Sequence, residues 1–112
     1  MISKALVAAS TKPLLLSILL DAETYGYRII KQMKILSGGR LKWSFGMLYP
    51  VLHRLEKDGF IASKWKASDK GRLRKYYRIT NAGRRELEQE KIQWLTVNKV
   101  FTRLWRSSEV QS

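Results

Sequence analysis

Hydrophobic positions along the chain follow a helical spacing in four segments and a strand-like alternation between the third and the fourth. The first segment, 13–20, is apolar around its whole axis, which predicts a helix buried at the domain centre or in a subunit interface. Ser3 is a candidate cap for an earlier turn. The helix therefore either begins at Pro13 or is longer and bends there.

The second segment is predicted to start with Thr24 as its cap and to end near Ser37, before a glycine pair. Gly26 costs about 1 kcal/mol relative to Ala in a helix, so it predicts close approach of another backbone, either the third helix or a phosphate. The residues expected on the core-facing side are Gly26, Ile29, Ile30, Met33 and Leu36.

The third segment follows a candidate short strand at 41–43 and opens at Ser44. Pro50 removes a backbone donor, so the helix must begin or bend near Gly46, and such an N-terminus can approach a phosphate. Gly59 is expected to end it. The core stripe is predicted at Leu48, Leu52 and Leu55, and the opposite side carries Met47, Tyr49, His53, Arg54 and Lys57.

A β-hairpin is predicted next, with strands at 60–66 and 72–79 and a turn at 67–71. Between Lys64 and Arg85 there are nine basic residues and one acidic residue, so most of the chain's net charge of +13 gathers here. Such a run is either a solvated face or a surface for a polyanion.

Thr80 is the predicted cap of a last helix, about 81–105, which would be about 37 Å long. Apolar residues recur on it at heptad spacing, as in a coiled coil. Because a helix of that length cannot be covered by one small domain, a second copy of the chain is expected along it. The predicted seam consists of Leu87, Trp94, Val97, Phe101 and Leu104.

The 112 residues suffice for one modest core, and we divide them into a domain at 1–80, the last helix at 81–106 and a flexible tail at 107–112. The 22 Lys and Arg against 9 Asp and Glu indicate a polyanionic partner, nucleic acid or an acidic membrane surface. The most apolar run, 14–20, is too short to span a bilayer, and the first residues lack the features of a secretory signal, so a cytoplasmic protein is expected.

The side-chain inventory argues against catalysis and metal binding. There is no cysteine and only one histidine, which excludes disulfides, thiolate sites and a histidine cluster, so no metal and no cofactor is expected. No paired carboxylates, nucleophile with a base, or phosphate-cradling glycine loop occurs at a useful spacing, so we do not expect an enzyme.

The order of the elements is that of a winged helix-turn-helix, a mainly α fold with a small antiparallel hairpin. In that fold the third helix would enter the major groove with Ser44, Gly46, Met47, Tyr49 and His53. The hairpin would hold phosphates with Lys64, Lys70, Arg72, Arg74 and Lys75. The alternative is an adaptor that uses the winged domain for protein contacts, without a footprint on DNA.

Four segments, 46–56, 59–61, 71–80 and Gly83-Arg84, resemble the PadR family of bacterial transcriptional regulators, and Tyr25-Gly26-Tyr27 matches that family's second-helix motif. The resemblance covers about 13–104, and the single long last helix is similar to the small subfamily. It implies a homodimeric repressor in the bacterial cytoplasm, associated with the nucleoid, that binds a palindromic operator and responds to small, often aromatic, effectors.

The resemblance also bears on single positions. In the drug-sensing branch an aromatic residue on the last helix stacks on planar ligands, which makes Trp94 the candidate platform; the alternative is a seam residue with no ligand. Met47 stands where threonine or another polar residue is common, and Lys66 near where many members have an acid. The other tryptophans, Trp43, Trp65 and Trp105, are expected to be packing residues.

Overall fold

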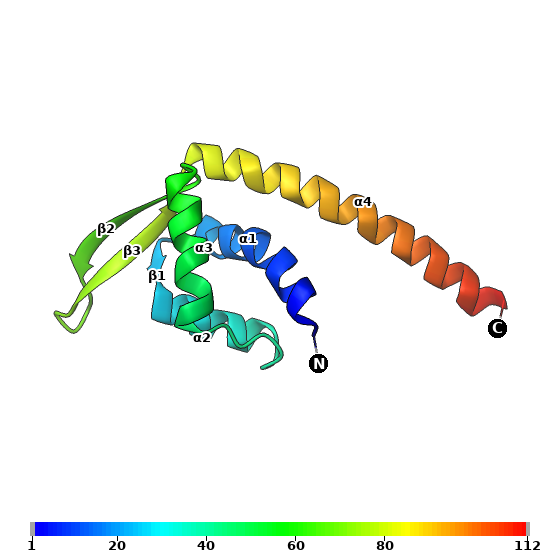
Figure 1. Ribbon diagram of the computed structural model, residues 1–112, viewed down its shortest axis with the longest axis horizontal. Helices are drawn as coiled ribbons and strands as arrows, with labels where there is room; N and C mark the ends of the chain where they lie inside the picture. The colour runs from blue at the N-terminus through cyan, green and yellow to red at the C-terminus, as the bar shows by residue number, and fades with distance from the viewer. Residues whose placement is uncertain (1, 112) are drawn as a thin grey trace.

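The computed structural model describes residues 2–111 and shows four helices with a three-stranded antiparallel sheet (Figure 1). The fold class predicted from the sequence is confirmed. The sheet order is β1-β3-β2. The elements are α1 (Lys4–Asp21), β1 (Thr24–Tyr25), α2 (Gly26–Leu36), α3 (Phe45–Lys57), β2 (Ile61–Ala67), β3 (Leu73–Ile79) and α4 (Asn81–Gln111).

Helix α1 adopts the longer of the two predicted forms and lies at the centre of the domain. Ser3 caps it, since its hydroxyl accepts a hydrogen bond from the Leu6 amide at 3.2 Å, and Pro13 lies inside the helix. Its buried residues are Thr11, Leu15, Leu16, Ile18 and Leu19. Helix α1 contacts α3, β3 and α4, so it joins three of the other elements.

The strand that joins the hairpin in the sheet is β1, and not the segment 41–43 predicted from the sequence. Thr24 pairs with Tyr77 of β3 instead of capping α2, and α2 follows with Tyr25 at the cap position and no side-chain cap. The prediction of Thr24 as a cap was wrong because this segment completes the free edge of β3. The strand expected at 41–43 is absent from the described chain; there the Trp43 side chain, 4% exposed, packs into the core.

The predicted core stripe of α3 is confirmed, since Leu48, Leu52 and Leu55 are all buried. The helix ends as predicted at Gly59, whose φ of 82° lies in the left-handed region. On α2, Gly26, Ile29 and Met33 are buried as predicted, but Leu36, also predicted on the core-facing side, is 66% exposed.

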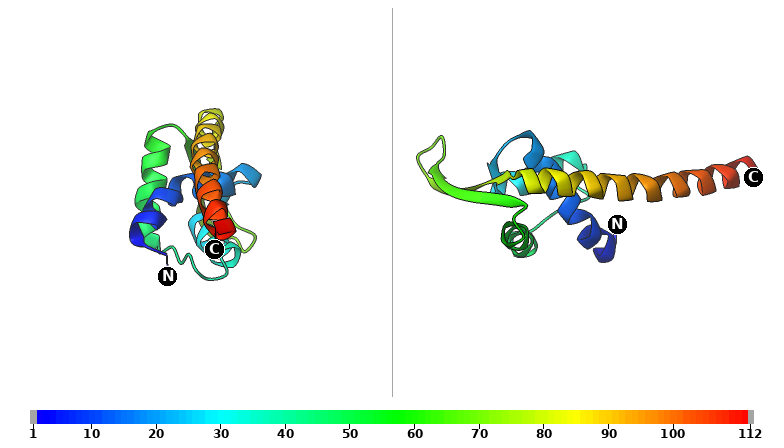
Figure 2. Two further views of the ribbon diagram at one scale, coloured as in Figure 1. Left: turned by 90° about the vertical axis from the view of Figure 1, so that its right-hand side faces the viewer. Right: turned by 90° about the horizontal axis from the view of Figure 1, so that it is seen from above.

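The hairpin of β2 and β3 is packed at its base and open at its tip. Its register runs from Ile61 opposite Ile79 at the base to Ala67 opposite Leu73 near the turn. The apolar base residues are buried, whereas Trp65 is 67% exposed, so the prediction that Trp65 is a packing residue was wrong. Figure 2 shows the hairpin and α4 leaving the helical body in opposite directions.

Helix α4 starts at the predicted cap, where the Thr80 hydroxyl accepts a hydrogen bond from the Gly83 amide at 3.0 Å. It runs past the predicted end near Trp105 to Gln111, so residues 107–111, expected as a tail, continue the helix; Ser112 lies outside the described residues. Leu87, predicted in the seam between copies, is 1% exposed and belongs to the core of its own chain.

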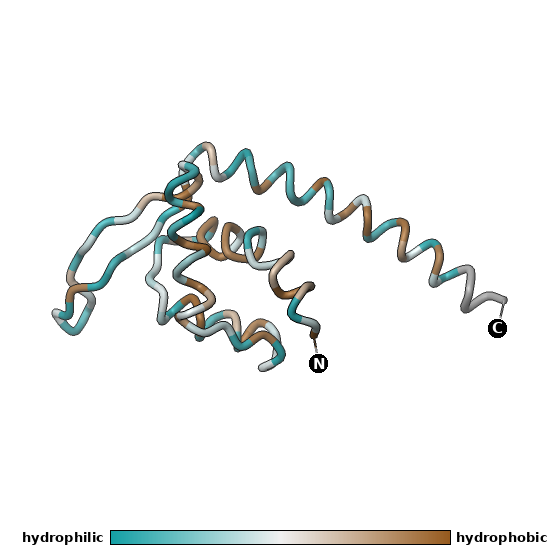
Figure 3. Tube along the Cα trace, viewed as in Figure 1, coloured by the Kyte–Doolittle hydropathy of each residue, from teal (hydrophilic) through white to brown (hydrophobic). Residues whose placement is uncertain are grey.

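Beyond its first turns α4 is uncovered. Every residue from Lys91 to Arg106 is exposed, although apolar positions recur along this stretch (Figure 3). Trp105, expected to be a packing residue, is 62% exposed and stacks on Phe101 with ring centroids 4.9 Å apart. The molecule is accordingly elongated, 60 × 29 × 21 Å.

A charged contact ties α4 to α1. Lys12 binds Glu86 and lies 3.5 Å from Glu90. Burial is the largest single influence and would lower the pKa of Lys12, but the hydrogen bonds and charges of the two glutamates together exceed it and raise that pKa. The ammonium group therefore stays charged at neutral pH and holds the two helices in one orientation.

The start of α4 permits a stability prediction. A methyl group at Gly83 would fall on the carbonyl oxygen of Phe60 and 2.8 Å from Cγ1 of Ile79. Because the backbone of Phe60 cannot move aside cheaply, Gly83→Ala should lower the free energy of unfolding by about 1–3 kcal/mol or more. Urea unfolding measures this.

The matched control is Gly46→Ala, the same change in a helix where the nearest atom, Oγ of Ser44, would lie 3.9 Å away. This variant should be as stable as the parent or up to about 1 kcal/mol more stable. Equal stability of the two variants would contradict the close approach at Gly83.

Candidate nucleic-acid interface

The N-terminal turn of α3 is an open surface. Ser44 caps the helix, its hydroxyl accepting a hydrogen bond from the Met47 amide at 3.2 Å, and Gly46 beside it is exposed. A Cβ at Gly46 would come no closer than 3.9 Å to the nearest atom, Oγ of Ser44, so a ligand can approach the backbone there. Met47, predicted on the exposed side, is half-buried and packs against the core, which reduces what it can present to a ligand.

Two aromatic side chains define the next part of this surface. Phe45 and Tyr49 stack with centroids 5.5 Å apart and remain 43% and 47% exposed. A Cβ at Gly26 would lie 3.3 Å from the Tyr49 hydroxyl and 3.5 Å from Phe45. Of the two predicted neighbours of Gly26, α3 is therefore the one observed, although it approaches with side chains and not with its backbone. His53 is exposed one turn further along.

The wing, defined as β2, β3 and the turn between them, distributes its cations over two faces and a tip. Lys75 lies on the face toward α3, where its Nζ is 3.9 Å from a carboxylate oxygen of Glu56. Lys64 and Arg74 belong to the opposite face, and Lys70 and Arg72 lie exposed at the turn. The structure therefore does not gather the five predicted phosphate-binding residues on one side.

The opposite face holds interactions that the sequence did not reveal. The Arg74 guanidinium lies 4.5 Å from the centroid of the Tyr25 ring, and Arg28 approaches the same ring at 5.2 Å. The Nε atom of Arg74 is buried, and within the described chain it has no hydrogen-bond partner. The one sequence signal for this region was the Tyr25-Gly26-Tyr27 motif. That motif did not indicate that two arginines contact the Tyr25 ring.

Lys66 is a wing cation already engaged by the protein. It binds Glu23 and lies 4.3 Å from the centroid of the Tyr76 ring. The hydrogen bond from Lys66 lowers the pKa of Glu23; burial opposes the shift, and the charges of Lys66, Lys64 and Arg78 add to it. Lys66 is thus the wing residue least available to an outside anion.

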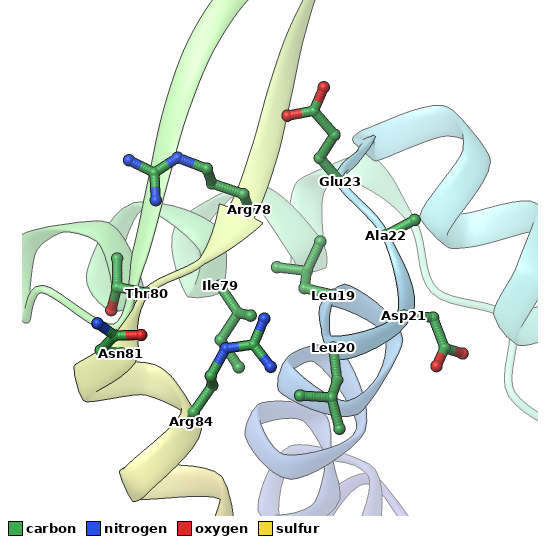
Figure 4. Close-up of a pocket in the computed structure, with 10 residues that line it drawn as sticks. All are labelled: Leu19, Leu20, Asp21, Ala22, Glu23, Arg78, Ile79, Thr80, Asn81 and Arg84. Carbon is green, nitrogen blue, oxygen red and sulfur yellow. The ribbon is translucent and has the colours of Figure 1, made fainter.

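Two of the cavities in the described part of the chain lie between α1 and α4, away from this surface. The larger, about 660 Å3, lies where α1 ends and α4 begins, and Figure 4 shows that apolar Leu19, Leu20 and Ile79 line it together with charged Arg78 and Arg84. A groove of about 250 Å3 between α1 and α4 is mostly apolar. Its lining residues are Ser10, Pro13, Leu14, Ser17, Leu87, Lys91 and Trp94.

Comparison with known proteins places this geometry in a family. The family model described as the transcriptional regulator PadR-like family matches residues 15–89, from α1 to the first turns of α4. The chain belongs to this family. The protein is therefore a PadR-like, DNA-binding transcriptional regulator. The family is one of transcriptional regulators and not of enzymes.

Solved PadR-like and related structures extend the likeness along α4. A PadR-like regulator from Bacillus cereus is 31% identical, with 90% of this chain and 96% of that chain covered and a TM-score of 0.81. A transcriptional regulator from Clostridium thermocellum is 30% identical over 89% and 97% of the two chains, also at 0.81. A Mycobacterium tuberculosis transcriptional regulator is 41% identical over 71 residues, 63% of each chain.

No helix among residues 2–111 combines the length and the apolar composition required to cross a membrane. Of the two polyanionic partners that the charge allowed, nucleic acid is the one that the family supports.

Proposed function

We propose that the protein is a homodimeric, sequence-specific repressor that binds a palindromic operator in the bacterial cytoplasm. The observation that supports the dimer is the uncovered part of α4. Every side chain of the 16 residues 91–106 is exposed, including large apolar ones. Contiguous exposed apolar surface of this kind marks interaction sites. On one side of this helix lie Trp94, Val97, Phe101 and Leu104, which are 39%, 51%, 44% and 61% exposed.

A second copy of the same helix is the simplest cover for this stripe. The four residues recur at the spacing of a coiled-coil seam, so an antiparallel or parallel partner helix would bury them together. Leu87 does not take part, because it is already in the core. Closed two-fold pairing then places two winged domains on one duplex, which is the arrangement that a palindromic site requires.

Within each winged domain the two parts of the surface have different roles. The start of α3 enters the major groove, where the exposed Gly46, Tyr49 and His53 are close enough to meet base edges or backbone, with Ser44 and the half-buried Met47 at their margin. Lys64, Lys70, Arg72, Arg74 and Lys75 bind phosphates from the wing, which gives affinity through counterion release. A bound dimer represses by covering the operator.

The effector site that we propose is the apolar groove beside Trp94. Trp94 presents part of its indole to this groove, and α1 supplies Pro13 and Leu14 as the facing wall. A planar aromatic compound can stack on the indole there. The larger cavity in Figure 4 suits this chemistry less well, because Asp21, Glu23, Arg78 and Arg84 surround it.

The wing's role is tested by the salt dependence of binding. Replacing Arg72 or Arg74 by Ala should weaken binding to all duplex sequences and reduce the slope of log K against log salt by about one. Lys66→Ala removes the same charge from the same hairpin, but Lys66 is bound to Glu23, so its slope should change less. A slope that stays the same in the arginine variants would count against phosphate binding by the wing.

The dimer is tested by sedimentation equilibrium at micromolar concentration. The parent should sediment as a dimer and Phe101→Glu as a monomer, because a carboxylate in an apolar seam loses its hydration. Thr96→Glu introduces the same carboxylate at an exposed position on another side of α4, and this variant should remain dimeric. A parent that is monomeric would support the adaptor function instead.

Effector binding is tested by tryptophan fluorescence. Planar aromatic compounds should quench the parent, and Trp94→Ala should lose this response, whereas Trp105→Ala, in the same helix but outside the groove, should keep it. If Trp94→Ala binds such compounds as tightly as the parent, measured by calorimetry, the site lies elsewhere.

A further inference from the structure

Two large apolar side chains of the wing are exposed to solvent, and the packing of the fold does not require them there. Trp65 and Leu73 are each 67% exposed, among the highest values for large apolar residues of the winged domain. Both lie in the distal half of the hairpin, beyond the buried base residues Ile61 and Ile79. Their exposure is not needed to build the sheet, because polar β-formers would pair equally well at these positions.

The two side chains form one apolar surface that faces α3. Trp65 is opposite Lys75, and Ala67 is opposite Leu73, so Trp65 and Leu73 are diagonal neighbours on the same face of the two-stranded ribbon. Together with Phe45 and Tyr49 of α3 they line a groove of about 180 Å3. This apolar pair is thus continuous with the part of α3 assigned to the major groove.

The surroundings of the pair identify its partner. Lys70, Arg72, Arg74 and Lys75 all lie within three residues of Leu73, and Asp69 is the only acid in the turn. Arg74 and Lys75 also line the groove beside the pair, and an apolar protein surface or a neutral ligand would not need these cations. The edge of a DNA groove presents both features, apolar deoxyribose between anionic phosphates, and apolar side chains are known to enter minor grooves.

We propose that Trp65 and Leu73 pack against the deoxyribose edge of the DNA groove next to the one that α3 enters. This inference rests on the proposed DNA-binding function and adds an apolar contact to it. The wing then contributes in two ways: cations that bind phosphates and depend on salt, and an apolar pair whose contribution does not depend on salt.

The test measures the affinity for duplex DNA over a range of salt concentrations. A lost apolar contact lowers the affinity at every salt concentration, whereas a lost phosphate contact changes the slope of log K against log salt. The double variant Trp65→Ser/Leu73→Ser should bind duplex DNA about tenfold more weakly than the parent at every salt concentration, with an unchanged slope, because no phosphate contact is lost. Arg72→Ala is the matched control on the same hairpin, and its slope should fall by about one. A double variant with the parent's affinity, or with a reduced slope, would overturn the proposal.

A spectroscopic measurement tests the same contact without the polar double variant. Trp43 is buried and Trp94 and Trp105 lie on α4, so Trp65 is the tryptophan that duplex DNA should reach. Adding DNA should change the parent's emission, and Trp65→Phe should remove most of the change; a change that persists in Trp65→Phe contradicts the contact. If the parent binds no duplex, the proposed function fails and this inference fails with it. If the parent binds and only these effects are missing, this inference fails alone.

Discussion

The packing of the first turns of α4 against α1 is the contact on which the rest of the molecule depends. Gly83 lets α4 pass close to the backbone of Phe60, Leu87 enters the core, and Lys12 binds the two glutamates of the next turns. These contacts fix the direction in which the remainder of α4 leaves the domain (Figure 1). That remainder is the proposed dimer helix, so in the proposed dimer this local packing contact would set the distance and angle between the two winged domains.

The winged domain combines two kinds of surface that respond differently to solution conditions. Cations on the wing attract a polyanion at long range, and salt weakens that attraction. The apolar pair on the wing and the aromatic pair on α3 act only at contact, where salt matters little. Ion pairs within the protein reduce the number of cations that the wing can offer to a polyanion. Glu23 is paired with Lys66, and Glu56 lies near Lys75.

Much of the fold follows from local patterns in the sequence. The stripe of α3, the cap at Thr80 and the stop at Gly59 depend on residues within a turn of one another, and all are observed. The errors concern contacts between distant segments. Thr24 has the chemistry of a cap, but pairing with Tyr77 across the sheet overrides it. Leu87 fits the heptad, yet α1 covers it before a second chain can.

The candidate site divides in the same way. Periodicity placed Tyr49 and His53 on the exposed side of α3, as observed, but Met47 turns toward the core. Nothing in the spacing could show that Arg28 and Arg74 meet on the ring of Tyr25, since three separate elements supply them. Nor could it show that Trp65 is exposed, because a strand-like alternation does not say how far a hairpin extends beyond the helices that cover it.

In the proposed function, paired α4 helices hold two winged domains at a fixed separation on DNA. The most direct test uses a duplex selected by the protein from random sequence and varies the spacing between its half-sites. Inserting about 5 base pairs turns one half-site to the opposite side of the duplex, whereas about 10 restores its side but lengthens the gap. Both insertions should reduce affinity to that of a single half-site; affinity that does not depend on the spacing would contradict the account.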